Sequence, residues 1–308
     1  MRIVFFGTPA FAVPSLRALL HGRFTVAGVV TQPDKPQGRS RSELIPSPVK
    51  IAARAAGIPV LQPVRPVGDV FTASLRRLEP DLGIVVAYGH ILRPTVLSVP
   101  PRGLINVHAS LLPRHRGAAP IQQAILEGDS ETGITIMQME EGLDSGPVLH
   151  HVATPIGRDE TAGSLAGRLA ELGAAALVEA LSLYSGGLVR PQPQDHSRAT
   201  YAPKLDREMA RIVWERDATA LVRQIRAFDP APGAWANLDG GNTLKLFGAR
   251  EASSSGAPGT VLEAGDRLVI AAGSGAVAVS EVQAAGKTRL PVGAWVRGRG
   301  VTVGQRLA

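Results

Sequence analysis

The segment GLINVHASLLPRHRG, residues 103–117, places an amide and an imidazole two residues apart. Its run of branched aliphatic residues predicts a strand from Leu104 to His108. Because alternate side chains of a strand point to opposite faces, Asn106 and His108 share one face, and Val107 points to the other. Ligands of open α/β sheets bind beyond the carboxyl ends of the strands, where this pair lies. The pair is therefore a candidate for chemistry on a bound ligand.

A carboxylate is expected beside this pair. The segment TIMQMEEGLDSG, residues 135–146, runs from the next predicted strand into a glycine-punctuated loop that carries Asp144 at the equivalent strand end. Each residue also has a purely structural interpretation: Asn106 as a turn former, His108 as a buried histidine with satisfied hydrogen bonds, and Asp144 as a loop cap. Three such groups at adjacent strand ends favour the catalytic interpretation.

An Asn–His–Asp set contains no serine or cysteine nucleophile, so it suits acyl transfer in which the substrates supply both nucleophile and leaving group. The protein then has to stabilise the tetrahedral intermediate. Asn106 would donate its amide to the oxyanion, and His108 would be a second donor, cationic if a carboxylate stabilises its charged form. Asp144 is the candidate for that carboxylate. It would also accept the proton lost by an attacking amine, directly or through water.

The elements that must position this set alternate between strands and helices. Apolar runs such as RIVFF, TVAGVV and DLGIVVAY alternate with helical stretches such as SLRALL, PVKIAARAAG and TAGSLAGRLAELGAAALVEALSLY. This alternation predicts an α/β fold with a Rossmann-like, mostly parallel sheet and flanking helices. The turn FFGTPAF after the first strand has one glycine, Gly7, where a dinucleotide-binding loop has three. No pyrophosphate site is therefore expected there.

The composition of the chain changes after the last long helical stretch. The segment GGLVRPQPQDHSRATYAPK is rich in proline, glycine and polar residues, which is typical of a linker. A helix is then expected in DATALVRQIRAF, with Asp217 as its cap. The short runs WANL, TLKLFGAR, GTVLEA, RLVIAAG and AVAVSEVQ predict a small antiparallel β-barrel, similar to an oligonucleotide-binding (OB) fold. The expected organisation is a catalytic domain over 1–188, a linker over 189–205 and the barrel over 206–308.

Composition limits the possible functions. The chain has 308 residues, with 33 lysines and arginines against 26 aspartates and glutamates, and its formal net charge of +7 favours a polyanion such as nucleic acid as partner. It has no cysteine, which excludes disulfides, a thiol nucleophile and cysteine-ligated metal sites.

The start MRIVFFG is typical of a strand without a leader, and no run of 18 apolar residues follows, so a cytoplasmic protein without membrane contact is expected. His90, His150 and His151 lack a carboxylate at metal-ligand spacing, so no metal site is expected.

The segments NVHASLLPRHRGAAPIQQAI and ETGITIMQMEEGLDSGPVL together resemble the core of the folate-dependent formyltransferases. These enzymes move a formyl group from 10-formyltetrahydrofolate to an amine. The resemblance implies that Asn106, His108 and Asp144 carry the chemistry and that 10-formyltetrahydrofolate is the co-substrate. In the family the loop after the strand contacts the folate, and the segment VVAYGHIL resembles a wall of the pterin pocket. The implied folate contacts are Ser110, Leu111, Leu112, Pro113 and Tyr88.

Within this family the rest of the chain resembles the methionyl-tRNA formyltransferases. The segment VVTQPDKPQGRSRSELIPSPVKIAA resembles the basic loop that enters the acceptor end of initiator tRNA, with Arg39 as its key arginine. It departs from the usual glycine and lysines at residues 40–43, and Val213 stands where an aspartate is usual. Three further segments resemble the family's C-terminal domain: YAPKLDREMARIVW, IRAFDPAPGAW and VGAWVRGRGVTVGQRL. No acidic residue follows Glu281, and the cations expected to contact tRNA are Arg39, Arg41, Lys287, Arg289, Arg297 and Arg299.

The implied function is transfer of a formyl group from 10-formyltetrahydrofolate to the free amino group of initiator methionyl-tRNA, for translation initiation, by a monomeric enzyme. One alternative is a formyltransferase acting on a sugar nucleotide or another small amine, against which the charge of +7 argues. The other alternative is a non-catalytic RNA-binding protein in which the barrel binds RNA. The Asn–His–Asp set argues against that alternative.

Overall fold

The computed structural model describes residues 1–37, 43–238, 241–298 and 300–308. It divides into two compact units. The first comprises Met1–Pro120, Thr132–Pro155 and Ala166–Ala202, and the second comprises Ile121–Glu131, Ile156–Leu165 and Pro203–Ala308. Among the described ranges, no helix combines the length and the apolar character needed to cross a membrane.

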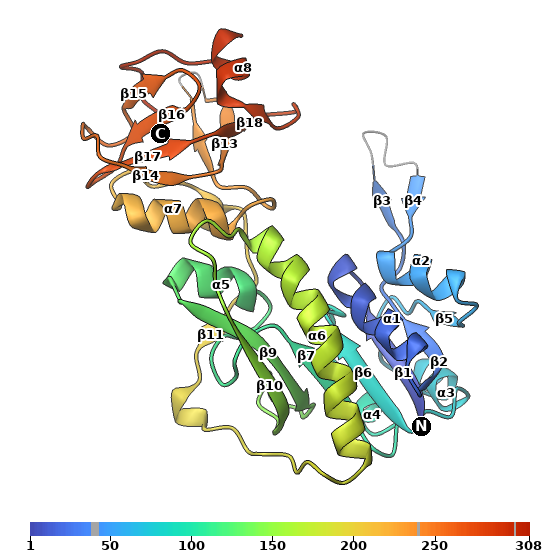
Figure 1. The fold of residues 1–308 in the computed structure, drawn as a ribbon. Helices are drawn as coiled ribbons and strands as arrows, with labels where there is room; N and C mark the ends of the chain where they lie inside the picture. Colours follow the sequence, from blue (N-terminus) through green and yellow to red (C-terminus); the bar gives the residue numbers. More distant parts are fainter. Residues whose placement is uncertain (38–42, 239–240, 299) are drawn as a thin grey trace. The chain divides into compact units, whose positions relative to one another are not determined.

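A seven-stranded sheet forms the centre of the first unit, in the order β10-β9-β7-β6-β1-β2-β5 (Figure 1). Strands β5, β2, β1, β6 and β7 run parallel to one another, while β9 runs antiparallel to β7. The predicted mostly parallel sheet with flanking helices is confirmed. Its strands are β1 (Arg2–Gly7), β2 (Thr25–Val30), β5 (Val60–Leu61), β6 (Leu82–Val86), β7 (Leu104–His108), β9 (Glu131–Gln138) and β10 (Val148–Pro155).

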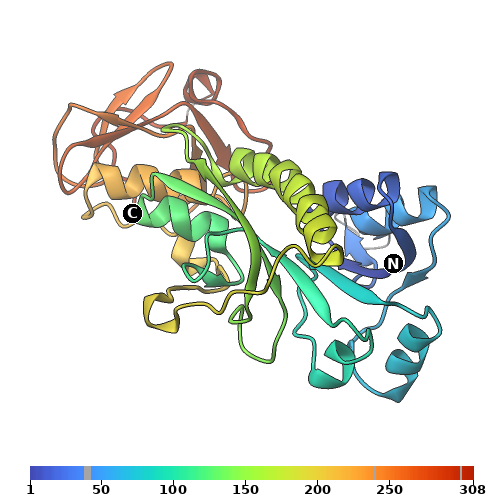
Figure 2. The same cartoon turned by 60° about the horizontal axis from the view of Figure 1, so that its bottom comes forward.

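Helices cover both faces of this sheet, as Figures 1 and 2 show. On one face, Leu104 belongs to a buried cluster that includes Phe71 of α3 and Val96 of α4. On the other face, α6 packs so closely that a Cβ added at Gly173 would lie 3.1 Å from Val107 Cγ1. The helices are α1 (Val13–His21), α2 (Pro48–Ala55), α3 (Asp69–Arg76), α4 (Pro94–Leu97) and α6 (Ala162–Ser185).

Two small two-stranded pairings complete the first unit. The strands β3 (Lys35–Gln37) and β4 (Glu43–Ile45) form an antiparallel hairpin on either side of residues 38–42. Strand β8 (Arg116–Gly117) pairs in parallel with β11 (Tyr201–Ala202). Residues 189–202, which the sequence analysis assigned to a linker, lie within this unit, and the predicted domain boundaries stay a prediction.

The second unit packs helices against two antiparallel four-stranded sheets, in the orders β12-β13-β18-β19 and β14-β17-β16-β15. Helix α7 (Ala218–Ala227) contributes Leu221 and Ile225, both fully buried, to the core. The predicted cap is confirmed, because Asp217 Oδ1 accepts a hydrogen bond of 2.7 Å from Ala220 N. The other elements are α5 (Pro120–Glu127), β12 (Trp235–Asn237), β13 (Thr243–Phe247), β14 (Arg250–Ala252), β15 (Val261–Ala264), β16 (Leu268–Ala271), β17 (Ala276–Val279), β18 (Glu281–Ala284), β19 (Leu290–Pro291) and α8 (Val292–Arg297).

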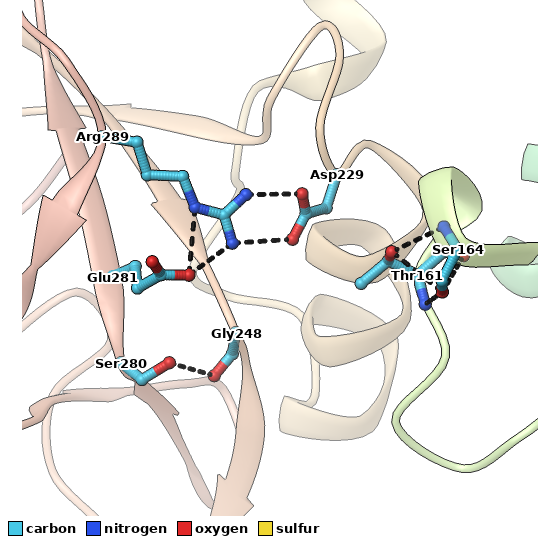
Figure 3. A network of polar contacts seen from close by, with 7 residues as sticks. All are labelled: Thr161, Ser164, Asp229, Gly248, Ser280, Glu281 and Arg289. Carbon is cyan, nitrogen blue, oxygen red and sulfur yellow. Dashed lines mark hydrogen bonds and ion pairs between the residues drawn. The ribbon is translucent and has the colours of Figure 1, made fainter. Parts of the chain in front are cut away.

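The run AVAVSEVQ, expected to be one strand, is two strands in different sheets. The chain leaves β17 and enters β18 at Ser280, and it leaves β13 and enters β14 through Gly248 and Ala249. These two crossings are adjacent, since Ser280 Oγ donates to Gly248 O at 3.4 Å (Figure 3). Gly248 has a φ of +62°, which favours glycine. The sequence conceals the break because valines of both strands, Val277 and Val279 of β17 and Val282 of β18, are buried in one shared core.

Candidate active site

Asn106 and His108 lie at the C-terminal end of β7, which confirms the predicted strand. Both side chains are buried, with 9% and 5% of their surface exposed. They lie on the same face as Leu104, opposite Val107, as the alternation predicts. His108 is the last residue of the strand and pairs with Thr135 of β9. The pair therefore sits where the sheet gives way to the loop that begins at Ala109.

Asp144 reaches this pair, although not for the reason that the sequence suggested. The sequence predicts Asp144 at the strand end equivalent to that of His108, but β9 is antiparallel to β7, and its last residue, Gln138, pairs with Ile105. The loop after β9 must therefore fold back along β7. It brings Asp144 Oδ2 to 3.6 Å from His108 Nδ1. The reversal uses a left-handed backbone at Asp144, with a φ of +46°, which few residues other than glycine adopt.

The environment of His108 fixes the roles of its ring nitrogens. Its Nε2 lies 3.0 Å from the backbone oxygen of His115. A carbonyl oxygen only accepts, so Nε2 carries a proton. A second proton on Nδ1 would make the ring cationic and would face the Asp144 carboxylate. The distance of 3.6 Å between Nδ1 and Asp144 Oδ2 exceeds that of a hydrogen bond.

Thr135 makes two hydrogen bonds to the loop that is predicted to contact folate. The Thr135 hydroxyl donates to Ser110 O at 2.7 Å and accepts from Leu112 N at 3.1 Å. Ser110 is fully buried, and its hydroxyl donates to Arg114 O at 2.6 Å. The side chains of residues 111–113 are half-buried, and the bond between Leu112 and Pro113 is cis. The sequence analysis did not find Thr135, whose only signal is its register opposite His108.

Tyr88 lies in the hydrophobic core of the first unit. Its side chain is 1% exposed, and its ring packs edge-on against Phe6 at 5.6 Å between centroids. Burial raises the pKa of its hydroxyl to about 12. Its backbone oxygen accepts hydrogen bonds from Thr8 and Gln32. A contact between Tyr88 and folate stays a prediction.

Sequence patterns did not reveal the polar groups that hydrogen-bond to Asp144. Gly117 N donates to Asp144 Oδ2 at 2.8 Å, and the Gln194 amide donates to Asp144 O at 2.9 Å. Gln194 is 8% exposed and lies in the segment assigned to the linker, where one glutamine among polar residues carries no signal. Arg116 in turn donates to Gln194 Oε1.

The predicted tRNA-binding cations fall into three groups. Arg39, Arg41 and Arg299 lie outside the described residues. Lys287 and Arg297 are exposed in the second unit. Arg289 is engaged within that unit: its guanidinium donates to both oxygens of Asp229 and to Glu281, as Figure 3 shows, and lies 4.1 Å from the centre of the Phe247 ring. Its contact with tRNA stays a prediction.

Comparison with known proteins agrees with this fold. Residues 1–181 match the family model "Formyl transferase", and residues 204–300 match "Formyl transferase, C-terminal domain". The fold and the site thus define a formyltransferase, and the chain belongs to the formyl transferase family.

Curated relatives of this chain include methionyl-tRNA formyltransferases. The protein of Citrifermentans bemidjiense is 47% identical over 97% of this chain and 93% of its own length. That of Magnetococcus marinus is 48% identical over 99% of this chain and 98% of its own. Among solved structures, HypX from Aquifex aeolicus in complex with tetrahydrofolic acid has a TM-score of 0.64 and 23% identity; it covers 97% of this chain, which spans about half, 47%, of HypX. This last likeness shows a shared fold.

Proposed function

We propose that this protein transfers the formyl group of 10-formyltetrahydrofolate to the amino group of initiator methionyl-tRNA and so acts in translation initiation. The observation that carries the proposal is the juxtaposition of Asn106, His108 and Asp144 in a chain that matches methionyl-tRNA formyltransferases over nearly its full length. Neither a small-amine formyltransferase nor a non-catalytic RNA-binding protein is favoured by these relatives.

The three side chains have complementary roles in this reaction. As the amine attacks, a bond from its nitrogen to the formyl carbon forms, and the bond from that carbon to the folate nitrogen then breaks. Asn106 donates its amide to the oxygen that becomes negative, and His108 donates from Nδ1 in its cationic form. Asp144 stabilises this cation and accepts the proton that the amine loses. This proton then passes to the folate nitrogen that leaves. The loop of residues 110–113 lies beside these groups and would hold the folate.

A substrate panel tests this function. The protein is incubated with 10-formyltetrahydrofolate and, in separate reactions, with methionyl initiator tRNA, glycinamide ribonucleotide and an amino sugar nucleotide. We expect formylated methionyl-tRNA as the product, with no comparable product from the two small amines. Transfer to a small amine at a similar or higher kcat/KM would contradict the proposal, and so would the absence of transfer to any of the three.

Arg39 is expected to act on tRNA rather than on chemistry. The change Arg39→Ala should lower kcat/KM with methionyl-tRNA strongly and leave the slow transfer of formyl to water or to a small amine near the wild-type rate. The physical reason is that the sequence resemblance implies contact of this arginine with the phosphates or bases of tRNA and not with the formyl group. Arg76→Ala, which removes an exposed arginine from α3, is the control. Equal losses in both reactions would reject a role in RNA binding.

The second unit gathers three cations around a pocket of about 500 Å³ that Arg207, Lys245 and Lys287 line together with Trp235. Such clusters attract phosphates, and each phosphate that a cation neutralises adds roughly 0.7 to 0.9 to the slope of log affinity against log salt concentration. This supports a contribution of the C-terminal region to tRNA binding.

The double change Lys287→Ala with Arg297→Ala should therefore flatten this slope by up to about 1.8 if both side chains contact phosphates. The measurement is tRNA affinity from low to moderate salt, with folate affinity expected to stay unchanged. Arg267→Ala is a matched control, because Arg267 is exposed in the same unit but paired with Glu263 at 2.9 Å. A slope equal to that of the wild type, in a folded double variant, would show that these two cations are only solvated.

A further inference from the structure

A buried amide lies directly behind the catalytic carboxylate. The Gln194 Nε2 atom donates to two backbone oxygens of the Asp144 loop, Asp144 O at 2.9 Å and Gly146 O at 2.7 Å. Its Oε1 atom accepts two hydrogen bonds from Arg116, from Nε at 3.2 Å and from Nη2 at 2.6 Å. Both donors and both acceptor positions of the amide are thus used, which leaves it a single orientation.

Strand β8 contacts both the Gln194 amide and the Asp144 carboxylate. The side chain of Arg116 holds Gln194, while the amide of the next residue, Gly117, donates to Asp144 Oδ2 at 2.8 Å. Arg116 is 4% exposed, and its Nη2 also lies 3.0 Å from His196 Nδ1. Because β11 pairs with β8 and Gln192 pairs with Val148, the chain is fixed to the first unit on either side of Gln194.

The backbone of Asp144 requires such restraints. Its φ of +46° lies in the left-handed region, a conformation that persists only where the surroundings enforce it. A loop released from Gln194 would relax toward an ordinary conformation. The carboxylate would then leave its position between Gly117 N and His108 Nδ1, where it lies 3.6 Å from the imidazole.

We infer that Gln194, oriented by Arg116, is a positioning residue that holds Asp144 in register with His108. This inference rests on the proposed function, because it takes Asp144 as the group that stabilises His108 and accepts the proton. Gln194 itself touches no reacting atom. Its effect on the reaction passes through the Asp144 backbone, so it should be seen in kcat and should disappear once the carboxylate is gone.

The test is Gln194→Met, which keeps the length of the side chain and removes all four hydrogen bonds. We expect kcat for formylation of methionyl-tRNA to fall by up to about a hundredfold, the effect of displacing a catalytic group by about 1 Å, with KM for both substrates within about threefold of the wild type. In an Asp144→Asn background the same change should lower kcat little further, because two residues that act as a unit are not additive.

The chain supplies a matched control. Gln224, in the second unit, is 3% exposed and also donates to two backbone oxygens, Met209 O and Arg211 O, both at 2.9 Å. Gln224→Met removes a buried amide with the same pair of donations to backbone oxygens, far from the catalytic residues in the sequence. It should lower the melting temperature and leave kcat unchanged. A purely structural role of Gln194 would give both variants the same kcat.

Gln194→Glu is a second, milder variant if the methionine variant does not fold. A carboxylate still accepts from Arg116 but cannot donate to the oxygens of Asp144 and Gly146, so kcat should fall as before. A folded Gln194 variant with wild-type kcat, or with full additivity to Asp144→Asn, overturns the inference. Wild-type protein that fails to formylate methionyl-tRNA in the same assay would instead refute the proposed function.

Discussion

Replacing Asn106 with alanine is expected to lower kcat for formyl transfer about a hundred- to a thousandfold. Loss of one donor to an oxyanion typically costs about 2.7 to 4 kcal/mol of transition-state stabilisation. Asn106 is 9% exposed on a central strand, so its amide is largely shielded from water. Because the full negative charge develops only during the reaction, KM should change much less than kcat.

The measurement is steady-state kinetics with methionyl-tRNA, together with thermal unfolding to verify that the variant is folded. Val107→Ala is the control on the same strand, since Val107 is 4% exposed and faces α6. It should lower stability and leave kcat close to the wild-type value. His108→Ala and Asp144→Ala should lower kcat at least as much as Asn106→Ala, and their combination should add little to the larger single effect. Near wild-type turnover by folded Asn106→Ala would refute the mechanism.

Replacing Arg289 with alanine is expected to destabilise the second unit by about 3 kcal/mol. Asp229 is 5% exposed, and Arg289 binds both of its oxygens while also donating to Glu281 (Figure 3). Removing one partner of a buried ion pair leaves the other charge uncompensated, which costs about 3 to 5 kcal/mol. The lower end of this range applies because the Arg289 side chain is one-third exposed.

Denaturant unfolding measures this change in the free energy of unfolding. Lys287→Ala removes a neighbouring cation that is exposed, and it should change stability by no more than about 0.5 kcal/mol. The expected pair of results is a large loss of stability for Arg289→Ala and a reduced salt dependence of tRNA affinity for variants of Lys287. Unchanged stability of Arg289→Ala together with weaker tRNA binding would show instead that Arg289 contacts tRNA.

Features that depend on neighbours along the chain can be predicted from the residues alone. The period of two in residues 104–108 predicts both the strand and the common face of Asn106 and His108, because strand geometry alone fixes that alternation. The cap at Asp217 follows from local hydrogen bonding. The repeated exchange of strand and helix patterns predicts the layered sheet, since each helix must bury its apolar face on the adjacent strands.

Which distant residues meet depends on how the whole chain packs. Asp144 reaches His108 because β9 turns antiparallel and its loop folds back, and strand direction is set by packing of the whole sheet rather than by the pattern within one strand. Gln194 meets the Asp144 loop 50 residues away, and Arg289 meets Asp229 60 residues away. A polar side chain carries no periodicity that identifies its partner. Its role is fixed when folding removes it from water and leaves its hydrogen bonds to be satisfied by whatever the fold brings beside it.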